Sequence, residues 1–291
     1  MTPHLETLKG PAVRTVRVGY SPCPNDTFLF YALVHGLVDG EGYAFEPLLA
    51  DVETLNELAL RAELPMTKAS YGVLPEVCDR YWCLRSGGAL GRGCGPLVVC
   101  GRDVPLEEAV RGRVAVPGVH TTANLLLDLR AGRTVEKVPM VFHEIMPAVA
   151  RGEVDAGVVI HEGRFTYRSH GLVALADLGQ WWEEATGLPI PLGGILLLRD
   201  RPELDPVRIQ RALRRSVEYA LAHPSAPSAY VRQHAQELDE AVVGAHIGLY
   251  VNEFSVDVGR EGQQAVEDLL TRAVEAGRCG CSGGTLFPPE E

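Results

Sequence analysis

The chain has 291 residues, of which 46% are hydrophobic and 22% charged, and its formal net charge is −11. This composition is typical of a folded globular protein and argues against disordered and collagen-like classes. The length favours two lobes over one average domain. The acidic balance argues against nucleic-acid binding, which needs clustered Lys and Arg. The acidic net charge is still compatible with binding of a small anion, because backbone N–H groups can hold an anion locally.

The sequence shows no sign of a targeting segment or a metal site. The first residues contain no basic segment followed by an apolar run, and no stretch is apolar for the length of a membrane span. We therefore expect a cytoplasmic protein with no membrane partner. Seven cysteines, without a C-x-x-C pair, are expected to be free thiols in a reducing compartment. Metal-ligand spacing such as H-E-x-x-H is absent, and we expect no metal.

Strand and helix patterns alternate from the start, which favours an α/β fold. Residues 16–20 are predicted as a strand, and Asn25 or Asp26 is positioned to cap the helix that follows. Asp51 is expected to cap a second helix, whose apolar residues recur at helical spacing. A further strand is predicted over 97–100.

Two segments between these elements lack an apolar pattern. Residues 67–70 read Thr-Lys-Ala-Ser and favour a solvated turn. Residues 87–95 are rich in glycine but lack the order of a P-loop or of a dinucleotide fingerprint, so they favour a mobile loop or hinge. Arg92, within this segment, is a candidate to reach a ligand.

The middle of the chain repeats the alternation, and the last third is mainly helical. The predicted strands of the middle block are 113–116, 138–142, 156–160, 172–176 and 195–198. Its predicted helices begin at Thr121-Thr122 and cover 146–150. The predicted helices of the last third begin at Asp205-Pro206 and lie around 225–237, 239–251 and 259–276, before a tail that is expected to be loose.

This order predicts two lobes of unequal size. Residues 1–101 and 200–291 would form a discontinuous larger α/β lobe, and residues 102–199 a smaller α/β lobe, joined by two crossing strands. A central cleft between hinged lobes is a natural ligand site.

His161 is the sharpest candidate for chemistry. It directly follows the apolar run 156–160, and ligands of open parallel sheets bind outside the carboxyl ends of the strands. Imidazole titrates near neutral pH, as a general base should, although His161 could instead hydrogen-bond a loop. His143, which also follows a strand-like run, is its rival. Thr121 and Thr122 could hold an anion at a helix start or serve as ordinary N-caps.

Five stretches, taken in order, resemble one family. They are Ser21–Phe28, Asp51–Asn56, Arg85–Gly93, His120–Ala123 and Ile160–Glu162. Over about residues 16–274 the chain is similar to the 1,4-dihydroxy-6-naphthoate synthase family of the futalosine route to menaquinone. The resemblance implies a two-lobed fold of the type II periplasmic-binding-protein kind with a central cleft. It implies a carbon–carbon lyase that converts cyclic dehypoxanthinylfutalosine, a carboxylated small molecule, to 1,4-dihydroxy-6-naphthoate without a cofactor.

The same resemblance assigns roles to individual residues. It implies that His161 is the catalytic base, that Lys68, Ala69 and Ser70 bind substrate, and that Thr121 and Thr122 do so as well. At Ala69 a larger apolar residue is expected in some relatives, and a contribution through the backbone would make that difference harmless.

Three alternatives remain at this point. One is a non-catalytic small-anion-binding protein on the same fold, since fold does not determine function. Another is a sister enzyme such as a chorismate dehydratase. The last is the effector half of a transcription regulator, against which the acidic charge and the missing helix-turn-helix argue.

Overall fold

The computed structural model describes residues 13–132, 135–235, 239–281 and 284–290, and within them ten strands form two sheets. The first sheet contains β1 (Arg14–Tyr20), β2 (Tyr43–Leu49), β3 (Met66–Ser70), β4 (Tyr81–Gly91) and β10 (Ile190–Leu198), in the order β2-β1-β3-β10-β4. The second contains β5 (Leu97–Cys100), β6 (Arg113–Val116), β7 (Glu136–Pro139), β8 (Ala156–Val159) and β9 (Val173–Asp177), in the order β7-β6-β8-β5-β9.

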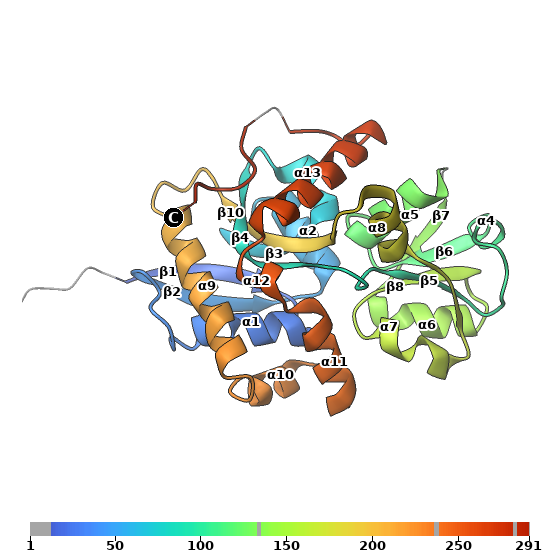
Figure 1. Ribbon diagram of the computed structural model, residues 1–291, viewed down its shortest axis with the longest axis horizontal. Helices are drawn as coiled ribbons and strands as arrows, with labels where there is room; N and C mark the ends of the chain where they lie inside the picture. The colour runs from blue at the N-terminus through green and yellow to red at the C-terminus, as the bar shows by residue number, and fades with distance from the viewer. Residues whose placement is uncertain (1–12, 133–134, 236–238, 282–283, 291) are drawn as a thin grey trace, which may run out of the picture.

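Each sheet is the centre of one lobe, and the two lobes lie side by side in Figure 1. The helices of the first lobe are α1 (Pro24–Val34), α2 (Val52–Leu60), α3 (Leu74–Val77), α9 (Pro206–Ala222), α10 (Ser228–His234), α11 (Glu240–Tyr250), α12 (Glu253–Val256) and α13 (Gly259–Glu275). Those of the second are α4 (Leu106–Ala109), α5 (Thr122–Ala131), α6 (Phe142–Ala150), α7 (Gly163–Thr166) and α8 (Leu178–Thr186). No helix in the described ranges is long and apolar enough to cross a membrane.

The strand pairing shows where the chain passes between the lobes. β1 is parallel to β2 and β3, whereas β10 is antiparallel to β3 and β4. β6 is parallel to β7 and β8, whereas β5 is antiparallel to β8 and β9. The crossings therefore lie between β4 and β5 and between α8 and β10. Both crossings come earlier than the expected boundaries at 101/102 and 199/200, because β5 pairs within the second sheet and β10 within the first.

The interpretation of 67–70 as a turn was wrong, and that of 87–95 as a loop or hinge was wrong as far as Gly91. Residues 92–95 lie outside the strands, in the crossing between β4 and β5, as a loop or hinge would. All five residues of β3 are buried, because the strand lies between β1 and β10. β4 runs through the glycine-rich segment as far as Gly91. Its Gly88 permits close packing, since a Cβ there would lie 3.2 Å from the Tyr71 hydroxyl. These strands lack an alternating pattern because both of their faces are covered.

Most of the expected helix starts are confirmed. The Asp51 carboxylate accepts hydrogen bonds from the N–H groups of Glu53 and Thr54 and caps α2, and Asp205 caps α9 in the same way. The cap of α1 is instead Cys23, because the side chain of Asp26 folds back to accept from Ser21. The strand predicted over 138–142 ends at Pro139, and α6 begins at Phe142.

The expectation of free cysteines is confirmed for five of the seven but was wrong for Cys78 and Cys281. The expectation of a loose tail was wrong as well. Cys78 and Cys281 form a disulfide, with their Cα atoms 5.7 Å apart. Beyond it, Leu286 and Phe287 are buried in the largest apolar cluster, and the Leu286 carbonyl accepts a 2.9 Å hydrogen bond from the Cys83 N–H. These two apolar side chains, which the overall composition of the tail does not reveal, dock the tail on the core. The docking brings Cys281 beside Cys78.

That cluster also joins the lobes. It contains Tyr71 and Leu269 of the first lobe together with Leu125 and Trp182 of the second. Gly72 makes the approach possible, since a Cβ there would lie 2.7 Å from backbone atoms of Thr121 and Thr122. The lobes are therefore in contact, and the site between them has walls from both lobes.

Candidate active site

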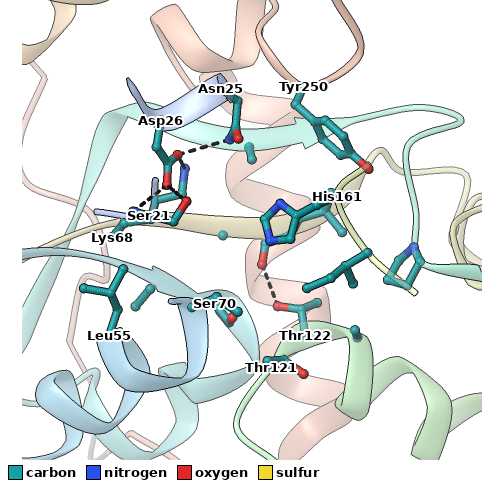
Figure 2. Close-up of a pocket in the computed structure, with 18 of the residues that line it drawn as sticks. Ser21, Asn25, Asp26, Leu55, Lys68, Ser70, Thr121, Thr122, His161 and Tyr250 are labelled. Atoms are coloured by element: carbon teal, nitrogen blue, oxygen red, sulfur yellow. Dashed lines mark hydrogen bonds and ion pairs between the residues drawn. The ribbon is translucent and has the colours of Figure 1, made fainter. Parts of the chain in front are cut away.

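The cavity between the lobes is bounded by the ends of elements from both sheets (Figure 2). It contains about 710 Å³ of empty space, which includes space open to solvent. Its lining residues are Ser21, Asn25, Asp26, Val52, Leu55, Lys68, Ala69, Ser70, Ala89, Cys94, Pro96, Thr121, Thr122, Ala123, Ile160, His161, Leu192, Gly193 and Tyr250. All the residues to which the family resemblance assigns a role are among them.

His161 lies just beyond the carboxyl end of β8. Its φ of +51° is in the left-handed region, a strained backbone conformation that costs about 1–3 kcal/mol and is common at functional sites. The ring lies between Phe142 of α6, at 5.0 Å between centroids, and His246 of α11, which stacks on it at 5.8 Å. Burial lowers the pKa of His161, and the charge of Glu162 partly opposes this effect. The neutral imidazole of a general base is therefore favoured.

The wall that the first lobe contributes carries a balanced ion pair. The Lys68 ammonium lies 3.2 Å from the Asp26 carboxylate, and the side chains are 9% and 3% exposed. Lys68 also donates to the Gly87 carbonyl. The neighbouring Ser70 hydroxyl accepts a hydrogen bond from the Asn56 amide. Because Asp26 neutralises Lys68, this wall offers polar contacts to a ligand without a net positive charge.

The start of α5 forms the opposing wall. The Thr121 hydroxyl accepts from the Asn124 N–H and donates to the Gly118 carbonyl, and the Thr122 hydroxyl donates to the Leu192 carbonyl at 2.6 Å (Figure 2). Both hydroxyls therefore serve the protein's own structure. Among the described residues, no hydrogen bond engages the backbone N–H of Thr122 or Ala123. Such N–H groups at a helix start favour an anion.

Several lining residues could not be recognised from the sequence. Asp26 was interpreted as a cap, and Tyr250 carried no signal beyond a helical pattern. Two polar groups beside His161, Glu162 and His246, were missed as well, although Glu162 is adjacent to it in the chain. Conversely, Arg92 does not reach the cavity, because it bonds the Gly187 carbonyl and Glu261 at the surface. His143 is exposed on α6 and does not line the cavity.

One group of side chains has the composition of a metal site. The Sγ of Cys23, a ring nitrogen of His161 and a carboxylate oxygen of Glu162 all lie within 4.8 Å of one another. Burial raises the pKa of the Cys23 thiol well above its usual value. Metals bind the thiolate, so this environment opposes coordination by Cys23.

Comparison with known families matches residues 16–275 to the family described as "Menaquinone biosynthesis". The chain belongs to this family. A 1,4-dihydroxy-6-naphtoate synthase from Thermus thermophilus is 54% identical over 275 residues, which cover 94% of this chain and 100% of that protein. A protein of the same name from Streptomyces coelicolor is 52% identical over 269 residues, which cover 90% of this chain and 94% of the relative. The family membership makes the chain an enzyme of menaquinone biosynthesis.

Solved structures show how the fold is related to other proteins. A protein from Archaeoglobus fulgidus superposes with a TM-score of 0.82 at 37% identity, covering 90% of this chain and 97% of the other. An alkanesulfonate-binding protein from Xanthomonas axonopodis has a TM-score of 0.64 at 17% identity, with coverage of 96% and 95%. The fold is thus the two-lobed type II periplasmic-binding-protein fold, as expected.

Proposed function

We propose that this protein is a 1,4-dihydroxy-6-naphthoate synthase, a carbon–carbon lyase that acts on cyclic dehypoxanthinylfutalosine with His161 as the general base. Relatives of that name at 52–54% identity support the reaction. The single observation that carries the choice of base is the position of His161, which is strained, half-buried and on the cavity wall at the end of β8. The cytoplasmic location stays a prediction.

We assign the substrate's carboxylate to the start of α5. The N–H groups of Thr122 and Ala123 are available there, and the dipole of the ten-residue helix favours an anion at this end. Lys68 is the weaker candidate because Asp26 already pairs with it. Ser70 and the backbone of Ala69 lie on the facing wall and suit the sugar part of the substrate.

In the proposed reaction the neutral His161 ring removes a proton from a carbon of the bound substrate. The electron pair released from that C–H bond moves through the substrate and breaks the carbon–carbon bond to the sugar-derived fragment. The fragment leaves with the electron pair of that bond and takes up a proton, and formation of an aromatic ring drives the step. The lobes hold the substrate against His161 and exclude water. General-base help of this kind contributes about 10²–10⁴-fold in rate.

The test is product formation by the purified protein. The substrate is incubated with the wild type, with His161→Gln and with His143→Gln, which removes an exposed histidine of the same lobe, and the product is identified by chromatography and mass spectrometry. The proposal predicts product from the wild type and His143→Gln, and a rate about 10²–10⁴-fold lower from His161→Gln. Equal rates from all three would exclude His161 as the base. Tight substrate binding without product would identify a binding protein of the same fold.

A further inference from the structure

Glu162 is a buried carboxylate that lacks a hydrogen-bond donor. The residue is 6% exposed, and neither side-chain oxygen has a partner among the described residues. Its backbone is well anchored, since its carbonyl accepts from the N–H groups of Phe165 and Thr166. A charged carboxylate that is removed from water needs a positive partner or several donors to be tolerated.

The nearest candidate partner, His246, cannot supply that donor as a neutral ring. Its Nδ1 lies 3.8 Å from Glu162 Oε1 and is itself buried without a hydrogen bond. Its Nε2 lies 3.1 Å from Asn25 Oδ1, and the Asn25 amide donates to Asp26 Oδ1, which orients the oxygen toward His246. Nε2 therefore carries the hydrogen, and Nδ1 presents a lone pair to the carboxylate.

His161 is in a position to meet the carboxylate instead. One of its ring nitrogens lies within 4.8 Å of a Glu162 oxygen. Burial lowers the pKa of both histidines but lowers that of His246 much further, and the charge of Glu162 opposes the effect at His161. The other groups around His161 are Asp26, Lys68, Cys23 and Tyr250 of the first lobe. Asp26 and Lys68 pair with each other, and burial raises the pKa of both Cys23 and Tyr250, which keeps them neutral.

We propose that Glu162 is a positioning residue for the reaction: its carboxylate is the counter-charge of the imidazolium that His161 becomes on taking the substrate's proton, while His246 is held neutral. The proton moves from the substrate carbon to a ring nitrogen of His161, and Glu162 exchanges no proton. His246 belongs to the first lobe and Glu162 to the second, so contact between the lobes completes this environment. Only the kinetic part of this proposal rests on the proposed function.

The decisive measurement needs no substrate. The pKa of His161 is measured by NMR titration in the full-length wild type, in Glu162→Gln and in Glu144→Gln, which removes an exposed carboxylate of the same lobe. His161→Gln identifies the resonance, and thermal melting verifies folding. We expect the pKa of His161 to fall by about 1 or more in Glu162→Gln, to stay unchanged in Glu144→Gln, and to lie above that of His246 in the wild type. An unchanged pKa in Glu162→Gln, or protonation of His246 before His161, would overturn the proposal.

Kinetics provides the second measurement. With the imidazolium less stabilised, kcat of Glu162→Gln should fall by up to about tenfold for each pH unit that the pKa of His161 loses, with KM within about twofold of the wild type. The acid limb of the kcat/KM profile should move to lower pH, and Glu162→Asp should recover part of kcat. If Glu162 had a purely structural role, Glu162→Gln would raise KM or lower the melting temperature, and the acid limb of the kcat/KM profile would stay at the same pH. If the wild type forms no product, the proposed function fails while the NMR result still decides the role of Glu162.

Discussion

Two glutamate–histidine contacts cross between the lobes, and they differ in how they are bonded. Glu53 of α2 accepts from the backbone N–H of His120 at 3.1 Å, contacts the His120 ring at 2.8 Å, and accepts from the Asn56 amide. Glu162 and His246 lie 3.8 Å apart, and neither the carboxylate nor the facing nitrogen has a hydrogen bond within the described structure. The first contact is partly exposed and satisfied, and the second is buried and unsatisfied.

The difference indicates separate roles for two similar pairs. A satisfied pair at the edge of the cleft holds the lobes together and has little left to offer a substrate. An unsatisfied pair beside His161 is unfavourable in the resting protein and becomes favourable when a positive charge forms next to it. This is how pre-arranged charge assists a reaction step.

The largest effect is expected from forcing the lobes apart, which disrupts both contacts at once. In Gly72→Ala the new Cβ would lie 2.7 Å from backbone atoms of Thr121 and Thr122. Overpacking of this kind costs about 1–3 kcal/mol, so kcat/KM should fall by about 10–100-fold while the first lobe stays folded. Steady-state kinetics combined with small-angle scattering tests this. Unchanged kinetics with a compact particle would show that the approach at Gly72 is unimportant.

The buried contact alone should make the protein sensitive to acid. Burial lowers the pKa of His246 well below 6.5 in the folded state, so the unfolded chain binds a proton there that the folded chain does not. The resulting stability is fully present above pH 6.5 and is lost as the pH falls toward the folded-state pKa. The free energy of unfolding should therefore drop by as much as about 1.4 kcal/mol per pH unit from this residue. Denaturant unfolding at pH 7 and pH 5 should show a smaller drop for His246→Gln, and an equal drop would contradict this assignment.

A smaller effect is expected when the exposed contact is weakened. Glu53→Gln keeps the shape of the side chain but removes the charge that bonds His120. Because the pair is partly exposed, KM should rise by about 2–5-fold with kcat nearly unchanged. A lower kcat at constant KM would mean that Glu53 takes part in the chemical step, and the distinction between the two contacts would fail.

Much of the site's framework follows from local sequence. His161 was found because it follows a buried strand, and the start of α5 because two threonines precede an apolar helix. The resemblance to a family supplied residues 68–70. By contrast, β3 and the glycine-rich β4 were misread, since their burial comes from neighbouring strands that no local pattern reveals.

The partners of His161 could not be predicted from the sequence for a similar reason. His246 lies on a helix of the other lobe, and its role depends on a tautomer determined by Asn25 and Asp26. Glu162 is adjacent in sequence, but its importance rests on having no donor, which requires the packed structure to be known. The Cys78–Cys281 disulfide likewise depends on the docking of the tail.

The central claim is that His161 is the base and is neutral when substrate binds, and the pH dependence of wild-type kcat/KM tests it most directly. A base must be deprotonated, so activity should be maximal above its pKa and should fall as the pH drops through it. Because burial lowers the pKa of His161 from 6.5, the acid limb should lie below pH 6.5 and coincide with the value measured for His161 in the free enzyme. An acid limb above pH 6.5, or one that matches no titration of His161, would contradict the account.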